Sequence, residues 1–252
     1  MARARCTICG KPAAYRCKYC GDILCKEHLP PGMHWCVGSG AYNNEPDKVR
    51  TTSMPYMERL KSIDSSIFSI FSHNYSYLLL FIISISFCLQ LLIPGYTKLF
   101  VLDPSKVIEM PWTLLTHIFL HGNFNHFIFN MLVFIFFAPV LERRIGSTKF
   151  LIIFLLSGIF AGIGWSVTAQ SSALGASGAI YAILATLAIL MPRLRVYLFF
   201  FIPLEIWVIA FLFPLYYDVL PIVLGSPDGI AHTAHLSGIL FGLLAGLALK
   251  GE

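Results

Sequence analysis

The chain has 252 residues, of which 57% are hydrophobic and only 12% are charged, and its formal net charge is +5. About a quarter of the residues of an ordinary soluble domain are charged, so this composition excludes that class. The surplus of basic residues is explained below by membrane topology, which argues against a nucleic-acid partner.

The first 36 residues are rich in potential metal ligands. Six of the seven cysteines lie here with two histidines, namely Cys6, Cys9, Cys17, Cys20, Cys25, His28, His34 and Cys36. A structural zinc ion takes four Cys or His donors, so the eight residues suit two zinc ions. A disulfide scaffold is the alternative, but the cytoplasmic position inferred below disfavours disulfides.

The spacing of these residues resembles the AN-one-type zinc finger, a small module with two zinc ions. The resemblance implies interleaved ligand pairs. One zinc would take Cys6, Cys9, Cys25 and His28, and the other Cys17, Cys20, His34 and Cys36.

We assign residues 1–40 to the finger. Its thiolates leave the metal-loaded module only mildly basic, which again disfavours nucleic acid. An adaptor that binds a cytosolic protein is the preferred role, and a passive folded cap is the alternative. Residues 41–74 form a linker, with an amphipathic surface helix expected from about Pro55 to Phe71.

Six apolar runs follow, and they predict an all-α polytopic membrane bundle over residues 75–252. A helix needs about 20 apolar residues to cross the hydrocarbon core, and the fourth run is short. The runs are Tyr75–Pro94, Thr113–Leu141, Phe150–Gln170, Ser177–Met191, Val196–Leu215 and His232–Leu249.

Basic residues predict the orientation of the bundle. Of the 18 Lys and Arg residues, only Lys98 and Lys106 fall on the side opposite to the others. The positive-inside rule then puts both termini in the cytoplasm, in a multi-pass protein of the plasma membrane.

Four polar side chains inside the runs are predicted to share one depth. Counted back from the cytoplasmic ends at 1.5 Å per residue, Ser177 lies about 21 Å and His235 about 22 Å away. His126 and Asn130 lie about 24 and 18 Å away. Polar groups at such depth usually mark function, and this layer lies just below the outer face of a core of about 30 Å.

These residues suit a serine hydrolase. Ser177, at a helix N-terminus, is the candidate nucleophile and His235 its general base. Gly175 permits a tight turn, and Tyr181 can pack beside the imidazole. His126 and Asn130, with the Ser177 N–H, can hold a developing oxyanion.

The last run contains Gly238, Gly242 and Gly246, a ridge of small residues that permits close packing against a neighbouring helix. The fourth run is the expected neighbour, because its approach would bring His235 to Ser177. No acid completes a triad in this interpretation. Glu205, the one carboxylate inside a run, is taken as a structural hydrogen-bond partner near mid-membrane.

Residues 75–249 resemble the rhomboid family of intramembrane serine proteases. The matching motifs are His117-x-x-x-His121, His126-x-x-x-Asn130, Glu142-x-Arg144-x-Gly146, Gly175-x-Ser177-Gly178-x-x-Tyr181 and Ala234-His235-x-x-Gly238-x-x-x-Gly242. The family pattern has Trp-Arg in the loop after the first span, where this chain has Trp112-Thr113.

The resemblance implies a six-helix bundle, a Ser177–His235 dyad, an oxyanion site at His126 and Asn130, and His121 as a nearby structural hydrogen-bonding group. It also implies single-span membrane proteins as substrates, cleaved near the outer membrane face, without a catalytic cofactor. We expect activity to fall at acid pH, where the base becomes protonated.

Two other functions are compatible with parts of the sequence. A non-catalytic adaptor would bind membrane helices and use the finger for recruitment, but it would need neither Ser177 nor His235. A zinc-responsive regulator would couple metal loss from the finger to the bundle.

Overall fold

The computed structural model describes residues 5–16, 23–29, 33–34, 74–198, 201–225 and 229–251. The chain divides into two compact units, residues 1–73 and 74–252. The surface helix expected from about Pro55 to Phe71 lies outside the described residues.

The N-terminal unit contains very little regular structure in its described part. Strand β1 (Tyr15–Arg16) pairs antiparallel with β2 (Ile23–Leu24), and the 3-10 turn η1 (Lys26–His28) follows. The buried cluster consists of Cys6, Leu24 and Cys25. A module with so small a core needs another source of folding energy, such as a metal ion.

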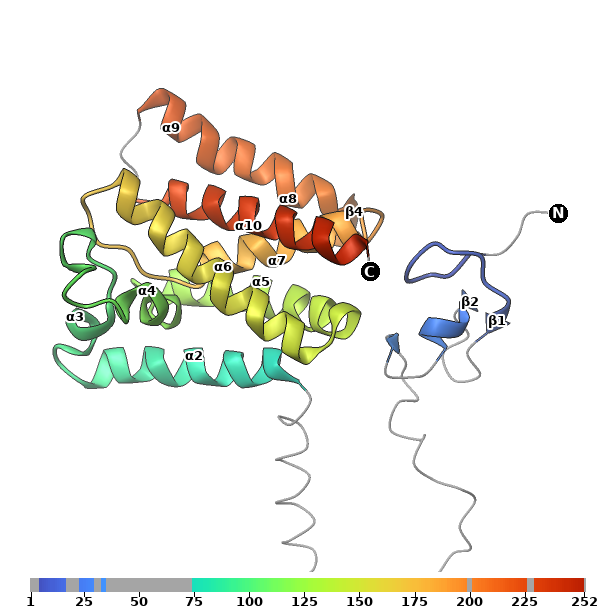
Figure 1. The fold of residues 1–252 in the computed structure, drawn as a ribbon, viewed down its shortest axis with the longest axis horizontal. Helices are drawn as coiled ribbons and strands as arrows, with labels where there is room; N and C mark the ends of the chain where they lie inside the picture. The colour runs from blue at the N-terminus through green and yellow to red at the C-terminus, as the bar shows by residue number, and fades with distance from the viewer. Residues whose placement is uncertain are drawn as a thin grey trace, which may run out of the picture. The chain divides into compact units, whose positions relative to one another are not determined.

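The second unit is built of helices (Figure 1). In its described part, five are long and apolar enough to cross a bilayer: α2 (Tyr75–Leu92), α5 (Phe124–Ile145), α6 (Ser147–Thr168), the continuous helix Ile206–Leu224 and α10 (His232–Lys250). A sixth apolar helix, α7 (Ser177–Leu190), has 14 residues. The predicted all-α bundle with a short fourth helix is confirmed.

Shorter elements join the long helices. Between α2 and α5 lie α3 (Tyr96–Phe100), η4 (Pro104–Lys106), α4 (Thr113–Thr116) and η5 (His117–Phe119). The hairpin of β3 (Arg195–Leu198) and β4 (Ile202–Glu205) follows α7. The helix Ile206–Leu224 consists of α8 (Ile206–Pro214), the π-helical turn η6 (Leu215–Val219) and α9 (Leu220–Leu224).

The predicted second span was wrong at its beginning. Residues 113–119 form the short elements α4 and η5, and the spanning helix α5 begins only at Phe124. The side chain of Asn123 accepts a hydrogen bond from the His126 N–H and so caps α5, as asparagine commonly does at helix N-termini. His117 and His121 therefore precede the spanning helix.

The predicted fifth span, Val196–Leu215, was also wrong. Its first half forms the β3–β4 hairpin, and the spanning helix runs from Ile206 to Leu224. Aromatic and β-branched residues are common in strands, so the apolar run 196–205 suits a hairpin as well as a helix. Because the spanning helix ends at Leu224 and not at Leu215, Asp218 lies inside it.

Helix α7 is the centre of the bundle. It contacts α5, α6, α8 and α10, and 10 of its 14 residues are buried. Most of its buried side chains are alanine, isoleucine or leucine. A helix that is apolar on every side belongs in the interior of an assembly, so the residue that begins α7 is held by the whole bundle.

Glycines allow α10 to approach α7 closely, as expected from the ridge in the last run. A Cβ on Gly238 would collide with the backbone carbonyl of Gly178, and one on Gly242 with the backbone of Ala182. The Thr186 hydroxyl also donates to the carbonyl of Gly242 across this interface, at 3.0 Å.

A buried carboxylate fixes the beginning of α2. Glu142 of α5 accepts hydrogen bonds from the backbone N–H groups of Tyr75 and Ser76, at 2.6 and 2.8 Å. The first N–H groups of a helix lack intrahelical partners and attract negative charge. Glu142 therefore ties the first span to the second.

We expect Gly238→Ala to destabilise the bundle, because the new methyl group meets backbone that cannot rotate away. Overpacking of this kind costs about 1–3 kcal/mol. Thermal unfolding in detergent measures it. Gly251→Ala is the matched control, since its Cβ would meet only the Ala248 carbonyl oxygen at 3.8 Å. Equal unfolding temperatures for the two variants would contradict the packing argument.

Candidate active site and metal-binding cluster

Ser177 is the first residue of α7, and the loop before it is held at several points. The backbone of Ala173 pairs with that of Leu102, and the Gly175 N–H donates to the His117 carbonyl at 2.9 Å. Gly175 has φ +132°, a conformation that glycine adopts far more readily than other residues. These contacts of the loop therefore fix the position of Ser177.

The Ser177 hydroxyl lies beside the imidazole of His235. Ser177 Oγ is 2.8 Å from His235 Nε2, within hydrogen-bonding distance. The ring of Tyr181, one turn along α7, stacks on the imidazole with centroids 4.6 Å apart and an interplanar angle of 23°. The candidate nucleophile, the candidate base and an aromatic ring that packs on that base are thus brought together.

The other nitrogen of His235 contacts a residue that the sequence analysis missed. Asp218 Oδ1 is 2.6 Å from His235 Nδ1 and 3.0 Å from His232 Nδ1. The Asp218 side chain is 1% exposed. The sequence interpretation found no acid to complete a triad, whereas the structure places a carboxylate directly beside His235.

Two signals in the sequence could have identified Asp218. It is a carboxylate in the apolar stretch 206–224, and His232 and His235 share one face of α10 because they are three residues apart. A fifth run that ends at Leu215 leaves Asp218 outside the membrane, so hydropathy alone does not place this carboxylate near His235.

Glu205 lies elsewhere. It is the N-cap residue of α8, at the beginning of the helix Ile206–Leu224. Its carboxylate accepts a hydrogen bond from the Trp207 indole N–H at 2.8 Å, which is the kind of structural role expected for it.

His126 lies against the loop that precedes Ser177. Its Nδ1 accepts a hydrogen bond from the Gly122 N–H at 3.3 Å, which leaves Nε2 to carry the proton of the neutral ring. A Cβ on Gly175 would lie 2.8 Å from His126 Cε1 and 3.0 Å from Nε2. The donor nitrogen of His126 is therefore next to the Gly175–Ser177 segment.

Asn130 is less directly engaged. Its amide Nδ2 donates to the His126 carbonyl, one turn earlier on α5, at 2.8 Å. The side chain is largely buried. An amide nitrogen carries two hydrogens, so this bond leaves one for another acceptor.

His117 and His121 hold neighbouring segments by hydrogen bonds. The His117 backbone carbonyl accepts a hydrogen bond from the Gly175 N–H, and the His117 ring donates its Nδ1–H to the Thr113 carbonyl at 2.9 Å. The His121 backbone exchanges two hydrogen bonds with the Gln90 amide. Burial lowers the pKa of His117 to about 4 and that of His121 to about 3, so both are neutral near pH 7.

The hydrogen-bonding role implied for the His121 side chain is not the one observed. Within the described ranges, its buried ring nitrogens have no hydrogen-bond partner. The ring packs edge-on against Phe127, with centroids 5.5 Å apart. His121 therefore acts as a packing group here.

A small cavity lies beside Ser177. Its volume is about 20 Å³, and its lining includes Ser177, His117, Trp165 and Gly162. A water molecule needs roughly 10–15 Å³ of such space. The cavity therefore has room for one water next to Ser177.

The similarity to known proteins agrees with this geometry. A family model described as the rhomboid domain matches residues 109–252, more than half of the chain. The chain belongs to the rhomboid family. With its apolar helices, this makes it a membrane protein.

The chain is also similar to proteins that are named rhomboid proteases. The rhomboid protease GlpG of Yersinia enterocolitica is 28% identical over 152 residues, and those of Yersinia pestis and Yersinia pseudotuberculosis are 29% identical over 152 residues. Each comparison covers 56% of this chain and 49% of the relative. The chain thus spans about half the length of these curated relatives.

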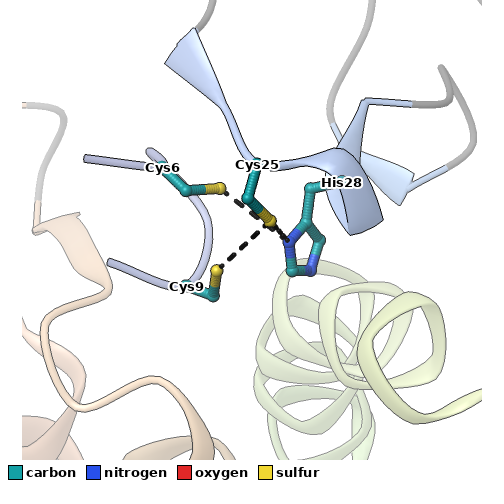
Figure 2. Close-up of side chains that lie close together, drawn as sticks. All are labelled: Cys6, Cys9, Cys25 and His28. Carbon is teal, nitrogen blue, oxygen red and sulfur yellow. Dashed lines mark hydrogen bonds between the residues drawn. The ribbon is translucent and has the colours of Figure 1, made fainter. Parts of the chain in front are cut away.

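A candidate metal site lies in the N-terminal unit, outside the rhomboid match. Cys6, Cys9, Cys25 and His28 bring their ligand atoms within 4.8 Å of one another. Figure 2 shows three thiols and an imidazole that face a common centre. This is one of the two ligand sets implied by the zinc-finger resemblance, and it could hold a metal ion.

The distances between these ligand atoms suit an ion with tetrahedral coordination. Cys9 Sγ lies 3.7 Å from Cys25 Sγ, and His28 Nδ1 lies 3.1 Å from Cys25 Sγ and 3.8 Å from Cys6 Sγ. Zinc–sulfur bonds of about 2.3 Å in a tetrahedron separate two sulfurs by about 3.8 Å. The cysteines at positions 6, 9 and 25 are not in disulfides, so the disulfide alternative does not apply to them.

The second predicted ligand set lies mostly outside the described residues. Cys17, Cys20 and Cys36 are not described. His34 is buried, and its Nδ1–H donates to the His28 carbonyl at 2.9 Å. The second zinc site stays a prediction.

We expect the full chain to bind zinc and Cys25→Ala to lose at least one ion per chain, because that thiol faces two of the other ligands. Elemental analysis of the purified protein gives the count. Cys88→Ala is the control, since Cys88 is an exposed residue of α2. Undiminished zinc in Cys25→Ala would rule out this cluster as a metal site.

Proposed function

We propose that residues 74–252 form an intramembrane serine endopeptidase in which Ser177 is the nucleophile and His235 the general base. The observation that carries the proposal is the 2.8 Å contact between Ser177 Oγ and His235 Nε2, at the start of a buried helix. Membership of the rhomboid family and the protease relatives support it.

The first step is attack by Ser177 Oγ on the scissile carbonyl. His235 Nε2 takes the hydroxyl proton as the new C–O bond forms, and then gives that proton to the departing amine. Water next attacks the acyl-enzyme, again with His235 as the base, and releases the carboxylic acid and the free serine. The cavity beside Ser177 is one place from which such water can come.

The developing negative charge on the carbonyl oxygen needs donors. The first N–H groups of α7 lack intrahelical partners and are available at its N-terminus. We propose the His126 Nε2–H and the remaining amide hydrogen of Asn130 as further donors, supported by the position of the His126 ring, where a Cβ on Gly175 would meet it. Such preorganised donors are often the largest electrostatic contribution to catalysis.

The proposed substrates are single-span membrane proteins with a helix-destabilising segment near the outer membrane face. The distribution of Lys and Arg supports a plasma-membrane orientation with cytoplasmic termini. The active site then opens toward the outside, since Ser177 begins α7 and Met191, at the other end, precedes Arg193 and Arg195.

We further propose that residues 1–40 form a cytoplasmic two-zinc finger that recruits a cytosolic protein. The Cys6–Cys9–Cys25–His28 cluster supports the first zinc. Both ions are structural, because four protein ligands leave no open position for catalysis.

A fluorophosphonate probe tests the proposed nucleophile in the detergent-purified full chain. The activated Ser177 Oγ displaces fluoride from phosphorus and leaves a stable phosphonyl ester. We expect no labelling of Ser177→Ala and at least about 100-fold slower labelling of His235→Ala, because the base is lost.

Ser172→Ala is the matched control, since Ser172 is an exposed serine of the loop before Ser177. It should label at the wild-type rate. Undiminished labelling of Ser177→Ala, or none of the folded wild-type protein, would refute the proposed function.

A further inference from the structure

Asp218 and His232 lie beside His235, but neither has a role in the serine–histidine mechanism above. We propose that Asp218 is a positioning residue for His235, so that Ser177, His235 and Asp218 act together as a triad within the membrane. This inference rests on the proposed function and adds an anionic third member to its dyad.

The two contacts of His235 assign its protons. An ionised carboxylate only accepts hydrogen bonds, so the 2.6 Å contact requires His235 Nδ1 to carry a proton and donate it to Asp218 Oδ1. The lone pair of the neutral ring is then on Nε2, which faces Ser177 Oγ at 2.8 Å. Asp218 thereby selects the tautomer that can accept the serine proton.

The fold holds the carboxylate in place. Asp218 lies in the π-helical turn η6, and its neighbours Tyr216 and Tyr217 are 62% and 53% exposed while Asp218 is buried. π-helical turns inside α-helices often occur at functional sites. Ile206, Ala210 and Pro214, at four-residue steps before Asp218, are also buried, so the carboxylate lies on the inward face of this helix.

A second imidazole orients the same oxygen. His232 Nδ1 lies 3.0 Å from Asp218 Oδ1 and donates to it, and the side chains of His232 and His235 are 9% and 12% exposed. Both come from one face of α10. Two donors on Oδ1 restrict the rotation of the carboxylate and partly compensate its removal from water.

Proton transfer to His235 creates a positive charge next to the negative charge of Asp218. Before attack, the buried group is a carboxylate beside two imidazoles. When Ser177 transfers its proton to Nε2, His235 becomes an imidazolium, and the adjacent carboxylate stabilises the positive charge. The proton on Nδ1 stays there throughout, as in soluble serine proteases. Burial strengthens this attraction because water screens it less.

A purely structural role would also explain the contacts, since Asp218 joins the helix Ile206–Leu224 to α10. A structural link and a positioning residue have different effects when they are lost. Loss of a structural link between the two helices, a tether, lowers stability and the fraction of protein that is folded. Loss of a positioning residue slows the reaction of every folded molecule.

The rate and the final extent of fluorophosphonate labelling separate these roles. Asp218→Asn keeps the shape of the side chain but removes its charge. We expect labelling to reach the wild-type extent, with a rate constant lower by at least about 10-fold and up to about 10⁴-fold. With a transmembrane peptide substrate, kcat should fall and KM should change little.

Thr186→Val is the matched control for a lost tether, because Thr186 makes a buried hydrogen bond between α7 and α10 away from His235. It should lower the unfolding temperature without slowing the labelling of folded protein. A wild-type rate constant in Asp218→Asn would overturn the positioning role, while labelling at Ser177 would leave the proposed protease intact.

A measurement on the unaltered protein applies if Asp218→Asn does not fold. Nitrogen NMR of the histidine-labelled full chain, assigned with His235→Ala, identifies the neutral tautomer of His235. We expect the proton on Nδ1. A neutral His235 with its proton on Nε2 would overturn the proposal, because Asp218 would then face an acceptor.

Discussion

The close approach of α10 to α7 sets the distance on which the site depends. Gly238 and Gly242 bring the two helix backbones together, and His235 lies one turn before Gly238, opposite the first residue of α7. Packing by small residues suits a bilayer, where lipid is as apolar as the side chains and burial alone does not drive helices together. The same interface that holds the bundle therefore also holds His235 against Ser177.

Much of the membrane unit could be predicted from the sequence, because apolar length and basic flanks are strong signals. The limits of α7 and α10 are within one residue of the expected ones, and α7 begins at Ser177. The second and fifth spans could not be placed by hydropathy. Asn123 caps α5 through its side chain, and Arg195–Leu198 pairs with Ile202–Glu205 as two antiparallel strands. Both features depend on hydrogen bonds that an apolar count does not detect.

The contacts of Asp218 show the other limit of the sequence. A carboxylate in a membrane is costly unless it is paired, and the pairing here depends on a π-helical turn meeting the His232–His235 face of α10. Neither Asp218 nor the two histidines indicate in the sequence that a π-helical turn will form. In the N-terminal unit, by contrast, the resemblance to a zinc-finger family implies the Cys6–Cys9–Cys25–His28 set, and the structure brings these four residues together.

The most direct test of intramembrane proteolysis is the position of the cut in a bilayer. The full chain would be reconstituted in liposomes with a single-span reporter that carries Gly and Pro near the outer end of its span. Mass spectrometry of the products then locates the cleaved bond. The account predicts a cut in the outer part of the span by the wild-type protein, and none by Ser177→Ala. An intact reporter beside folded wild-type protein, or the same cut made by Ser177→Ala, would contradict it.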